Sequence, residues 1–202
     1  MESPKGPTVP ILNGKYAMLS SLGEGNTSKV YLAQTLAEPK TLVAVKIMKE
    51  EFLMRDEESR KAVVNEVVIL STLKHPNIIK ILEYGDAGWV LKPNGKELTG
   101  LVYIVLEFVA GGLLFDLCQL LGGLGEEIGR YFFKQMLASL AYMDSMKVSH
   151  RDLKLENILV DRDMTLKIAD FGYATFKKAD FMTSYRGTFT YMAPEIKEGR
   201  PY

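Results

Sequence analysis

Hydrophobic residues follow two different periods along the chain, and the period changes near its midpoint. Residues 16–34, 42–48 and 101–106 carry apolar side chains in short, partly alternating runs, a pattern that predicts β-strands. Residues 114–121 and 126–146 instead repeat apolar side chains at helical spacing. This order predicts an α+β protein with a small antiparallel β lobe, a mainly α-helical second lobe and a ligand cleft between the lobes.

One helix is expected inside the strand-rich part. Residues 51–73 return several valines and Leu70 to one side and keep charged residues on the other, which predicts a single amphipathic helix. A hairpin should follow, because Asn94-Gly95 is a favoured tight-turn dipeptide between two apolar runs.

The apolar positions of residues 126–146 form a stripe that we interpret as ordinary core. Such a stripe needs no cofactor to explain it. Its members are Ile128, Phe132, Phe133, Met136, Leu137, Leu140 and Tyr142.

Composition argues against several classes of function. The 202 residues contain 25 basic and 25 acidic side chains, so no net field favours nucleic acid or an anionic membrane. A hydrophobic content of 47% is enough for a real core. The single cysteine, Cys118, cannot form an internal disulfide, which favours a reducing, intracellular and cytoplasmic setting.

Residues 100–125 are apolar enough to suggest a membrane helix, but their charges argue against it. Glu107 and Asp116 lie inside the stretch, and each would cost about 2.5–3.5 kcal/mol near the centre of a bilayer. Gly111-Gly112 also divides it. We therefore expect a buried strand, a hinge and a helix, and no membrane span.

The strongest chemical signal is a pair of short motifs. His150 to Asn157 supplies a carboxylate, a lysine and an amide, and Asp170-Phe171-Gly172 follows thirteen residues after Asn157. Phosphoryl transfer needs a group that orients the attacking hydroxyl, a cation for the phosphate and oxygen ligands for Mg²⁺. The two motifs together provide this set.

Three further motifs accompany these two: Leu22 to Val30, Val43-Ala44-Val45-Lys46 and Ala193-Pro194-Glu195. All five occur in the order of the eukaryotic protein kinase family, serine/threonine type, which the chain resembles from Tyr16 onward. The motifs look closest to the calmodulin-dependent and AMP-activated-like group.

The resemblance implies a two-lobed fold. Residues 1–15 would be a flexible tail, 16–106 the N-lobe with one regulatory helix, 107–112 the hinge and 113–202 a partial C-lobe. The chain looks like a domain cut short, because several more helices follow this point in the family.

The resemblance also implies an ATP site. Lys46 would contact the α- and β-phosphates, and Glu66 on the regulatory helix would be its ion-pair partner. Val30 and Ala44 would cover the adenine ring. The full set implied to bind the nucleotide is Leu22, Gly23, Glu24, Gly25, Asn26, Thr27, Ser28, Lys29, Val30, Ala44, Lys46, Glu107, Val109 and Leu159.

The catalytic roles follow from the same resemblance. Asp152 would be the base that orients the substrate hydroxyl, and Lys154 would steady the γ-phosphate. Asn157 and Asp170 would hold Mg²⁺, which prefers hard oxygen ligands. Thr188 would contact both Asp152 and Lys154.

Two positions bear on substrates. Leu113 stands where many members of the family have a glutamate that touches ribose and a basic substrate residue, and leucine accepts no hydrogen bond. Glu156 resembles a substrate-facing acid. We therefore expect at most a moderate preference for basic substrates.

Regulation by an upstream kinase is implied as well. An arginine at the position of Arg151 often pairs with a phosphorylated residue in the family. Ser184 matches the usual site and Thr183 is second, and a phosphate there would add about −1.5 to −2 charge.

The leading hypothesis is a protein serine/threonine kinase that uses Mg-ATP and phosphorylates protein substrates. The alternative is a catalytically impaired pseudokinase or truncated ATP-binding scaffold. A small-molecule kinase is weaker, because Gly187-Thr188 and Ala193-Pro194-Glu195 belong to a peptide-binding segment.

Overall fold

The computed structural model describes residues 7–177 and 187–201. The chain divides into two compact units, the first made of Met1–Arg60 with Ile81–Phe108 and the second of Lys61–Lys80 with Val109–Tyr202. The second unit thus takes in most of the helix that we expected in the N-lobe. The lobe boundaries stated above stay predictions.

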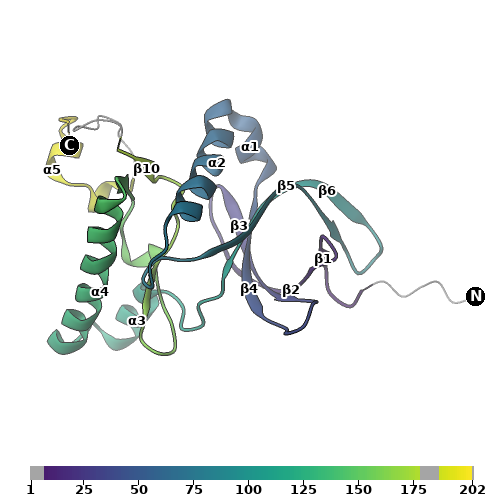
Figure 1. Cartoon of the computed structure of the whole chain (residues 1–202), viewed down its shortest axis with the longest axis horizontal. Helices are drawn as coiled ribbons and strands as arrows, with labels where there is room; N and C mark the ends of the chain where they lie inside the picture. The colour runs from purple at the N-terminus through teal and green to yellow at the C-terminus, as the bar shows by residue number, and fades with distance from the viewer. Residues whose placement is uncertain (1–6, 178–186, 202) are drawn as a thin grey trace, which may run out of the picture. The chain divides into compact units, whose positions relative to one another are not determined.

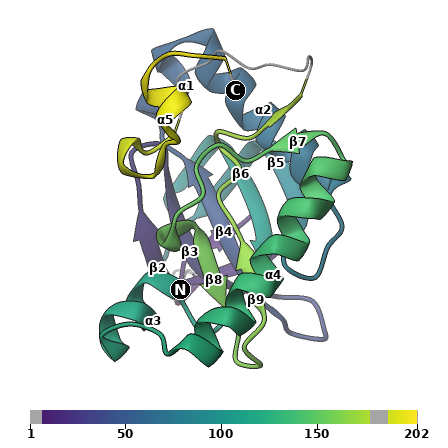
Figure 2. The same ribbon diagram turned by 90° about the vertical axis from the view of Figure 1, so that its left-hand side faces the viewer.

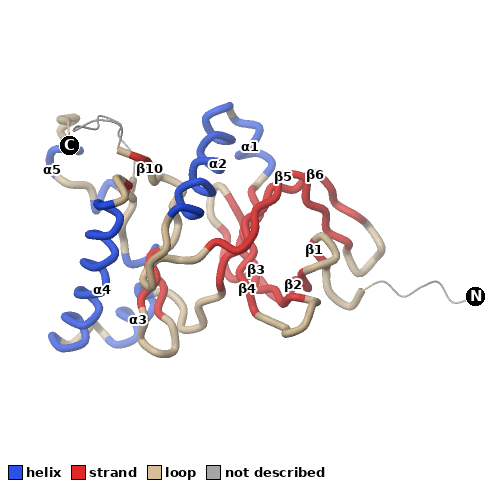
Figure 3. The backbone as a smooth tube through the Cα atoms, in the orientation of Figure 1, coloured by secondary structure: helices blue, strands red, loops and turns tan. Residues whose placement is uncertain are grey.

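The first unit is an antiparallel sheet (Figures 1 and 3). Its spatial order is β1-β2-β3-β4-β6-β5, and β1 pairs with β5 as well as with β2. The short helix α1 (Glu50–Arg55) follows β4 directly. The strands are β1 (Ile11–Leu12), β2 (Tyr16–Glu24), β3 (Ser28–Thr35), β4 (Leu42–Met48), β5 (Ile81–Leu91) and β6 (Glu97–Glu107).

One face of this sheet forms the core of the first unit. Alternate residues along paired strands share a face, and here they include Ala33 of β3 and Val43 and Val45 of β4, each at most 2% exposed. Tyr103 of β6 fills the space over β5, where a Cβ atom at Gly85 would lie 2.4 Å from its ring. A larger residue at Gly85 would displace the ring.

The second unit combines helices with two short strand pairs. β7 (Val148–Ser149) pairs with β10 (Thr175–Phe176), and β8 (Ile158–Val160) pairs with β9 (Leu166–Ile168), both antiparallel. Figure 2 shows β8 and β9 beside α3 and α4, which they contact. The helices are α2 (Glu57–Thr72), whose first turn belongs to the first unit, α3 (Leu114–Leu121), α4 (Glu126–Ser145), α5 (Pro194–Lys197) and the 3₁₀ turns η1 (Leu155–Asn157) and η2 (Phe189–Tyr191).

The strand pair β8–β9 packs into a small apolar core. Leu114 of α3 and Phe132 of α4 are each 1% exposed and contact Ile158, Val160 and Leu166. The β8–β9 hairpin is therefore held in place by apolar packing. The predicted metal ligands flank this hairpin, so the same packing limits their movement.

The prediction of a single helix over residues 51–73 is wrong, because two helices form there. The chain forms α1 and α2 with a break at Asp56, whose backbone is extended at φ −165° and ψ 167°. The Asp56 carboxylate accepts hydrogen bonds of 2.7 Å from both the backbone N–H and the hydroxyl of Ser59. This is an N-cap, which favours the start of a new helix over continuation of the first.

The interpretation of the α4 stripe as core is also largely wrong. Phe132 is buried, but Phe133 is 55% exposed and Leu137 is 48% exposed. Ile128 and Leu140 are likewise exposed, while Met136 and Tyr142 are half-buried. The apolar stripe of α4 is wider than the helix face that contacts β7 and β9. The side chains along its edges are therefore left exposed by the other described residues.

Membrane spans were searched over the described residues. None of the helices there has both the length and the apolar character that crossing a bilayer would require.

Candidate active site

Asp152 is the centre of a hydrogen-bond cluster in the second unit. Its side chain is 3% exposed. Oδ1 accepts a 2.6 Å hydrogen bond from the Thr188 hydroxyl, and Oδ2 accepts one of 3.0 Å from Nδ2 of Asn157 and lies 3.1 Å from Nζ of Lys154. Lys154 also donates to Thr188 at 2.9 Å. The predicted contacts of Thr188 with Asp152 and Lys154 are therefore confirmed.

These partners decide the charge of Asp152. Burial by itself would raise the pKa of the carboxyl, but the hydrogen bonds from Thr188, Lys154 and Asn157 outweigh it and hold the pKa below its ordinary value. Asp152 is therefore ionised at neutral pH. An ionised carboxylate with fixed lone pairs can accept a hydrogen bond from a hydroxyl group and orient it.

The buried ring of His150 packs beside the loop that carries Asp152. His150 is 3% exposed, and its ring meets Phe171 edge-on with the centroids 4.7 Å apart. Nδ1 accepts from the Asp152 N–H at 3.3 Å, and Nε2 lies 3.0 Å from the carbonyl oxygen of Ala169. The two contacts fit a neutral ring protonated at Nε2, and burial lowers the pKa of His150 accordingly. His150 is therefore a packed, neutral ring.

The two predicted metal ligands flank the β8–β9 hairpin. Asn157 precedes β8 and Asp170 lies two residues beyond β9. The backbone N–H of Ala169 donates to the carbonyl oxygen of Asn157 at 2.8 Å, which holds the two ends of the hairpin together. Asp170 is exposed and has a positive φ of 57°.

The donor set at this hairpin fits magnesium. Nδ2 of Asn157 donates to both the carbonyl and the carboxylate of Asp152, which turns the amide oxygen of Asn157 the other way. An amide oxygen and a carboxylate are hard ligands, and Mg²⁺ commonly takes only one or two protein ligands beside phosphate oxygens. Groups of three or more His, Cys, Asp and Glu residues suited to a metal are absent from the described part of the chain.

Gly187 lets Thr188 approach Asp152. Its φ is +111°, and a Cβ atom there would lie 2.2 Å from the carbonyl oxygen of Arg151. Only glycine fits both the conformation and the space. Arg151, itself at φ 68°, donates from Nε to the carbonyl oxygen of Tyr173 at 2.7 Å.

Glu66 lies on the inner side of α2. It is 4% exposed, and a Cβ atom at Gly172 would lie 3.8 Å from its Oε2. The sequence-predicted carboxylate is thus beside the Asp170-Phe171-Gly172 turn, within the second unit.

Three of the predicted nucleotide residues of the first unit, Val30, Ala44 and Lys46, share one face of β3 and β4. Val30 pairs with Lys46 and Leu32 with Ala44, so these side chains project from the face opposite the core. Lys46 is 8% exposed. Glu107 ends β6 and pairs with Val43. Lys46 and Ala44 are therefore presented together, as an ATP site would need.

The glycine turn between β2 and β3 is open at its backbone. A Cβ atom at Gly23 would meet no heavy atom within 4 Å. The N–H of Gly25 donates to the carbonyl oxygen of Ser28, and the N–H of Lys49 donates to that of Thr27, each at 2.9 Å. The turn is tied to the end of β4, and its open side leaves room for a ligand.

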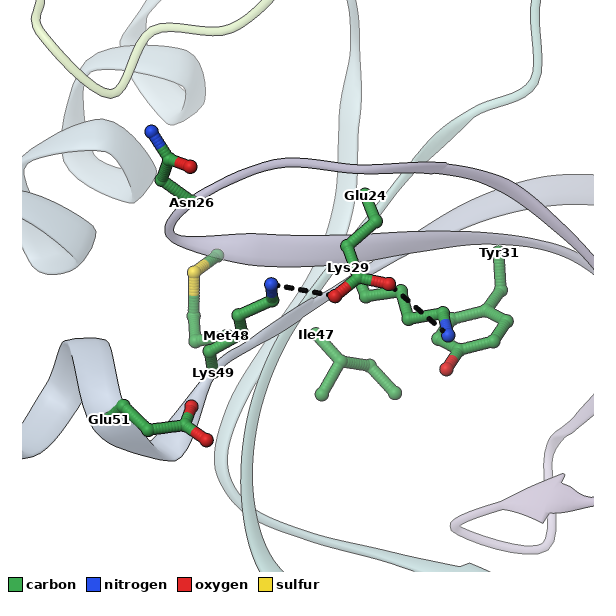
Figure 4. A pocket seen from close by; sticks show the side chains of 8 residues that line it. All are labelled: Glu24, Asn26, Lys29, Tyr31, Ile47, Met48, Lys49 and Glu51. Carbon is green, nitrogen blue, oxygen red and sulfur yellow. Dashed lines mark ion pairs between the residues drawn. The ribbon is translucent and has the colours of Figure 1, made fainter.

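Sequence reasoning missed a charged hollow beside this turn. It encloses about 530 Å³ and is lined by Glu24, Asn26, Lys29, Tyr31, Ile47, Met48, Lys49 and Glu51. Figure 4 shows the Glu24 carboxylate between two ammonium groups, 2.6 Å from Lys49 and 3.4 Å from Lys29. The hydrogen bond and the charge of Lys49 hold the pKa of Glu24 below its usual value.

The hollow includes Glu24, Asn26 and Lys29 from the predicted nucleotide set, but it lies on the other face of the sheet from the rest of that set on β3 and β4. Tyr31 and Ile47 line it and pack on the core side of the sheet, whereas Val30 and Lys46 project from the other side. We therefore do not assign ATP to it. The only sequence signal for the hollow was the pair of charged residues, Glu24 and Lys29, on either side of the turn between β2 and β3.

Three other predicted residues lie where strands and helices join. Val109 is 6% exposed. Leu113, which precedes α3, pairs with Leu159 of β8 through an isolated β-bridge. Glu156 in η1 lies 3.4 Å from the hydroxyl of Tyr191, a long contact. Thr183 and Ser184 lie outside the described residues.

Comparison with known proteins agrees with this geometry. The family model described as "Protein kinase domain" matches residues 16–202. The chain is 40% identical over 184 residues to "Probable serine/threonine-protein kinase MARK-B" of Dictyostelium discoideum, covering 91% of this chain and 24% of that protein. It is 35% identical over 199 residues to "Serine/threonine-protein kinase SIK1" of Mus musculus, covering 98% and 24%.

A third relative is "Serine/threonine-protein kinase SIK3 homolog" of Danio rerio, 34% identical over 190 residues. That alignment covers 94% of this chain and 15% of the relative. The chain thus spans a quarter or less of the length of these relatives. Because the family model covers almost the whole chain, the chain belongs to the protein kinase domain family.

Proposed function

We propose that this chain is a protein serine/threonine kinase that transfers the γ-phosphoryl group of Mg-ATP to serine and threonine hydroxyls of protein substrates. The observation that carries the proposal is the cluster of Asp152, Lys154 and Thr188. A buried, ionised carboxylate, an ammonium group and a hydroxyl lie within 3.1 Å of one another. The relatives named above are also called serine/threonine-protein kinases.

The proposed chemistry divides among few residues. Asp152 accepts a hydrogen bond from the substrate hydroxyl and aims its oxygen at the γ-phosphorus. It takes the hydroxyl proton as the new O–P bond forms and the bond from the γ-phosphorus to the β,γ-bridging oxygen of ATP breaks, which releases ADP. Lys154 offsets negative charge on the transferred group. Thr188 keeps both side chains in place.

Asn157 and Asp170 are the residues that would hold Mg²⁺. The ion supplies positive charge for the phosphate oxygens when it is bound. Lys46, the glycine turn and the face carrying Val30 and Ala44 are proposed to bind ATP, together with Glu107, Val109 and Leu159. Glu66 is proposed to be the ion-pair partner of Lys46, as the family resemblance implies.

Regulation by an upstream kinase at Ser184 or Thr183 is part of the proposal. Arg151, which the family resemblance pairs with such a phosphorylated residue, donates from Nε to the Tyr173 carbonyl oxygen at 2.7 Å. An intracellular setting remains a prediction.

The test is transfer of radiolabelled phosphate from Mg-ATP to a basic protein substrate, with Asp152→Asn as the control. Transfer that disappears in the control supports the proposal. If the wild-type chain transfers nothing but binds ATP in a thermal-shift assay, the ATP-binding scaffold replaces the kinase. If it neither transfers nor binds, both fail for this chain.

A further inference from the structure

Asn65 joins α2 to a distant turn of the same unit. Its Nδ2 donates a 2.7 Å hydrogen bond to the carbonyl oxygen of Ala174, 109 residues later. Ala174 is 1% exposed. A buried carbonyl needs a partner, and the side chain of Asn65 provides it.

The accepting carbonyl belongs to a rigid turn. The N–H of Ala174 donates to the carbonyl oxygen of Phe171 at 2.9 Å, which closes the chain just after Asp170. Phe171 is fully buried and its ring is held edge-on by His150. A displacement of Ala174 would therefore be transmitted to Asp170.

The next residue of α2 faces the same turn. Glu66 follows Asn65, and its Oε2 lies 3.8 Å from the Cβ position of Gly172. Side chains of successive helical residues point about 100° apart, so the two residues meet the turn at different points. With both seated, α2 can neither rotate about its axis nor slide along the turn without breaking the Asn65 hydrogen bond.

We propose that Asn65 is a positioning residue that locks α2 to the Asp170-Phe171-Gly172 turn. It keeps Glu66 and Asp170 in a fixed relationship while touching neither nucleotide nor substrate. The inference rests on the proposed kinase function for its effect on rate. The lock itself does not depend on that function.

The matched variants are Asn65→Asp and Asn65→Ala. Aspartate keeps the size of the side chain but loses the N–H donor and places an acceptor against the Ala174 carbonyl; alanine removes the donor without adding charge. Asn65→Gln retains an amide donor and is the rescue variant. Ser71→Ala is the control, because the Ser71 hydroxyl donates within the same helix, to the carbonyl oxygen of Val67.

Hydrogen exchange tests the lock without reference to activity. In Asn65→Asp and Asn65→Ala, backbone amides of Gly172 to Ala174 should exchange faster than in the wild type. Ser71→Ala should leave them unchanged. Equal exchange in all four proteins would overturn the proposal.

Kinetics test the consequence for the reaction. Loss of one hydrogen bond of this kind lowers the ratio of locked to unlocked molecules about three- to tenfold. We expect kcat/KM for ATP to fall by up to that factor per folded molecule, KM for the protein substrate to stay constant and Gln to restore part of the rate. Unchanged kinetics in Asn65→Asp would overturn the positioning role.

The two failures are distinguishable. A wild-type chain without phosphoryl transfer contradicts the proposed function, while the exchange experiment still decides whether Asn65 locks the turn. A wild-type chain with transfer, but with Asn65 variants equal to it in both assays, contradicts the inference alone.

Discussion

The hydroxyl of Thr188 donates a 2.6 Å hydrogen bond to Oδ1 of Asp152, 36 residues earlier in the chain. The same hydroxyl oxygen accepts from Nζ of Lys154. One small side chain therefore orients both the proposed base and the proposed phosphate ligand, and it does so from the segment that carries the family's peptide-binding motif.

Replacement of this hydroxyl should slow phosphoryl transfer. Thr188→Val keeps the shape but removes one donor from Asp152, and hydrogen bonds to charged groups contribute about 1.5–3 kcal/mol. We expect kcat to fall at least about tenfold, with Thr188→Ser close to wild type. The pKa of Asp152 should rise toward its ordinary value, which a pH–rate profile would show as an acid limb moved upward. A Val variant with wild-type kcat would rule out this role for the hydroxyl.

Gly187→Ala should be more disruptive than alanine at another glycine of positive φ. At Gly187 the added Cβ would meet the Arg151 carbonyl oxygen at 2.2 Å, whereas at Gly95, with φ +78°, it would meet nothing within 4 Å. Gly95→Ala should cost about 1–2 kcal/mol from its left-handed backbone alone. Gly187→Ala should also lose phosphoryl transfer, because the backbone must move Thr188 away from Asp152. Denaturant unfolding and activity assays on both variants would show whether the two effects separate.

Unfolding free energy should depend on pH through His150. Burial lowers its folded-state pKa below the ordinary value of 6.5, so the unfolded state binds more protons in the interval between the two values. The stabilisation is complete above about pH 6.5 and is lost as pH falls through that interval, at no more than about 1.4 kcal/mol per pH unit.

The variant His150→Tyr tests this pH dependence. It keeps an aromatic ring against Phe171 but does not titrate near pH 6, so it should flatten the slope of unfolding free energy against pH. His75, whose pKa burial also lowers, would retain its own contribution to the slope. An unchanged slope in the Tyr variant would assign the effect elsewhere.

The tyrosine network of the first unit should contribute strongly to stability. Tyr103 donates to Oε1 of Glu83 at 2.7 Å and accepts from Nδ2 of Asn13 at 2.7 Å. Burial and the Glu83 hydrogen bond raise the pKa of Tyr103 to about 12. Tyr103→Phe leaves two polar partners short of a bond and should cost about 1–3 kcal/mol.

The control for this variant is Tyr131→Phe, at a residue that is 51% exposed on α4. It should change the unfolding free energy by less than about 0.5 kcal/mol. Urea titrations of the two variants give the comparison. Equal midpoints would mean that the network does not stabilise the first unit.

Local patterns predicted individual elements well. The ranges expected for β4 and α3 coincide with those observed, and the strand pattern expected over residues 16–34 corresponds to β2 and β3. These elements depend on period and turn residues, which a single stretch of sequence contains. The break at Asp56 was missed although aspartate is a good N-cap, because residues 55–61 are all polar and such a run also fits the solvent-facing side of one continuous helix.

Burial was harder to predict than secondary structure. Phe132 and Phe133 are both apolar neighbours in the same stripe, yet one is 1% and the other 55% exposed. Period alone describes the apolar face of a helix; which part of that face is covered depends on the elements packed against it.

The order and spacing of residues along the chain were enough to predict the chemical groups of this protein, Asp152, Lys154, Asn157 and Asp170, and most of the strands and helices that carry them. The long-range pairs became visible in the folded chain alone. The contact of Asn65 with Ala174 spans 109 residues and that of Thr188 with Asp152 spans 36. No local period encodes such pairs, because they arise where separately formed elements meet and each buried polar atom takes the partner that packing brings within reach.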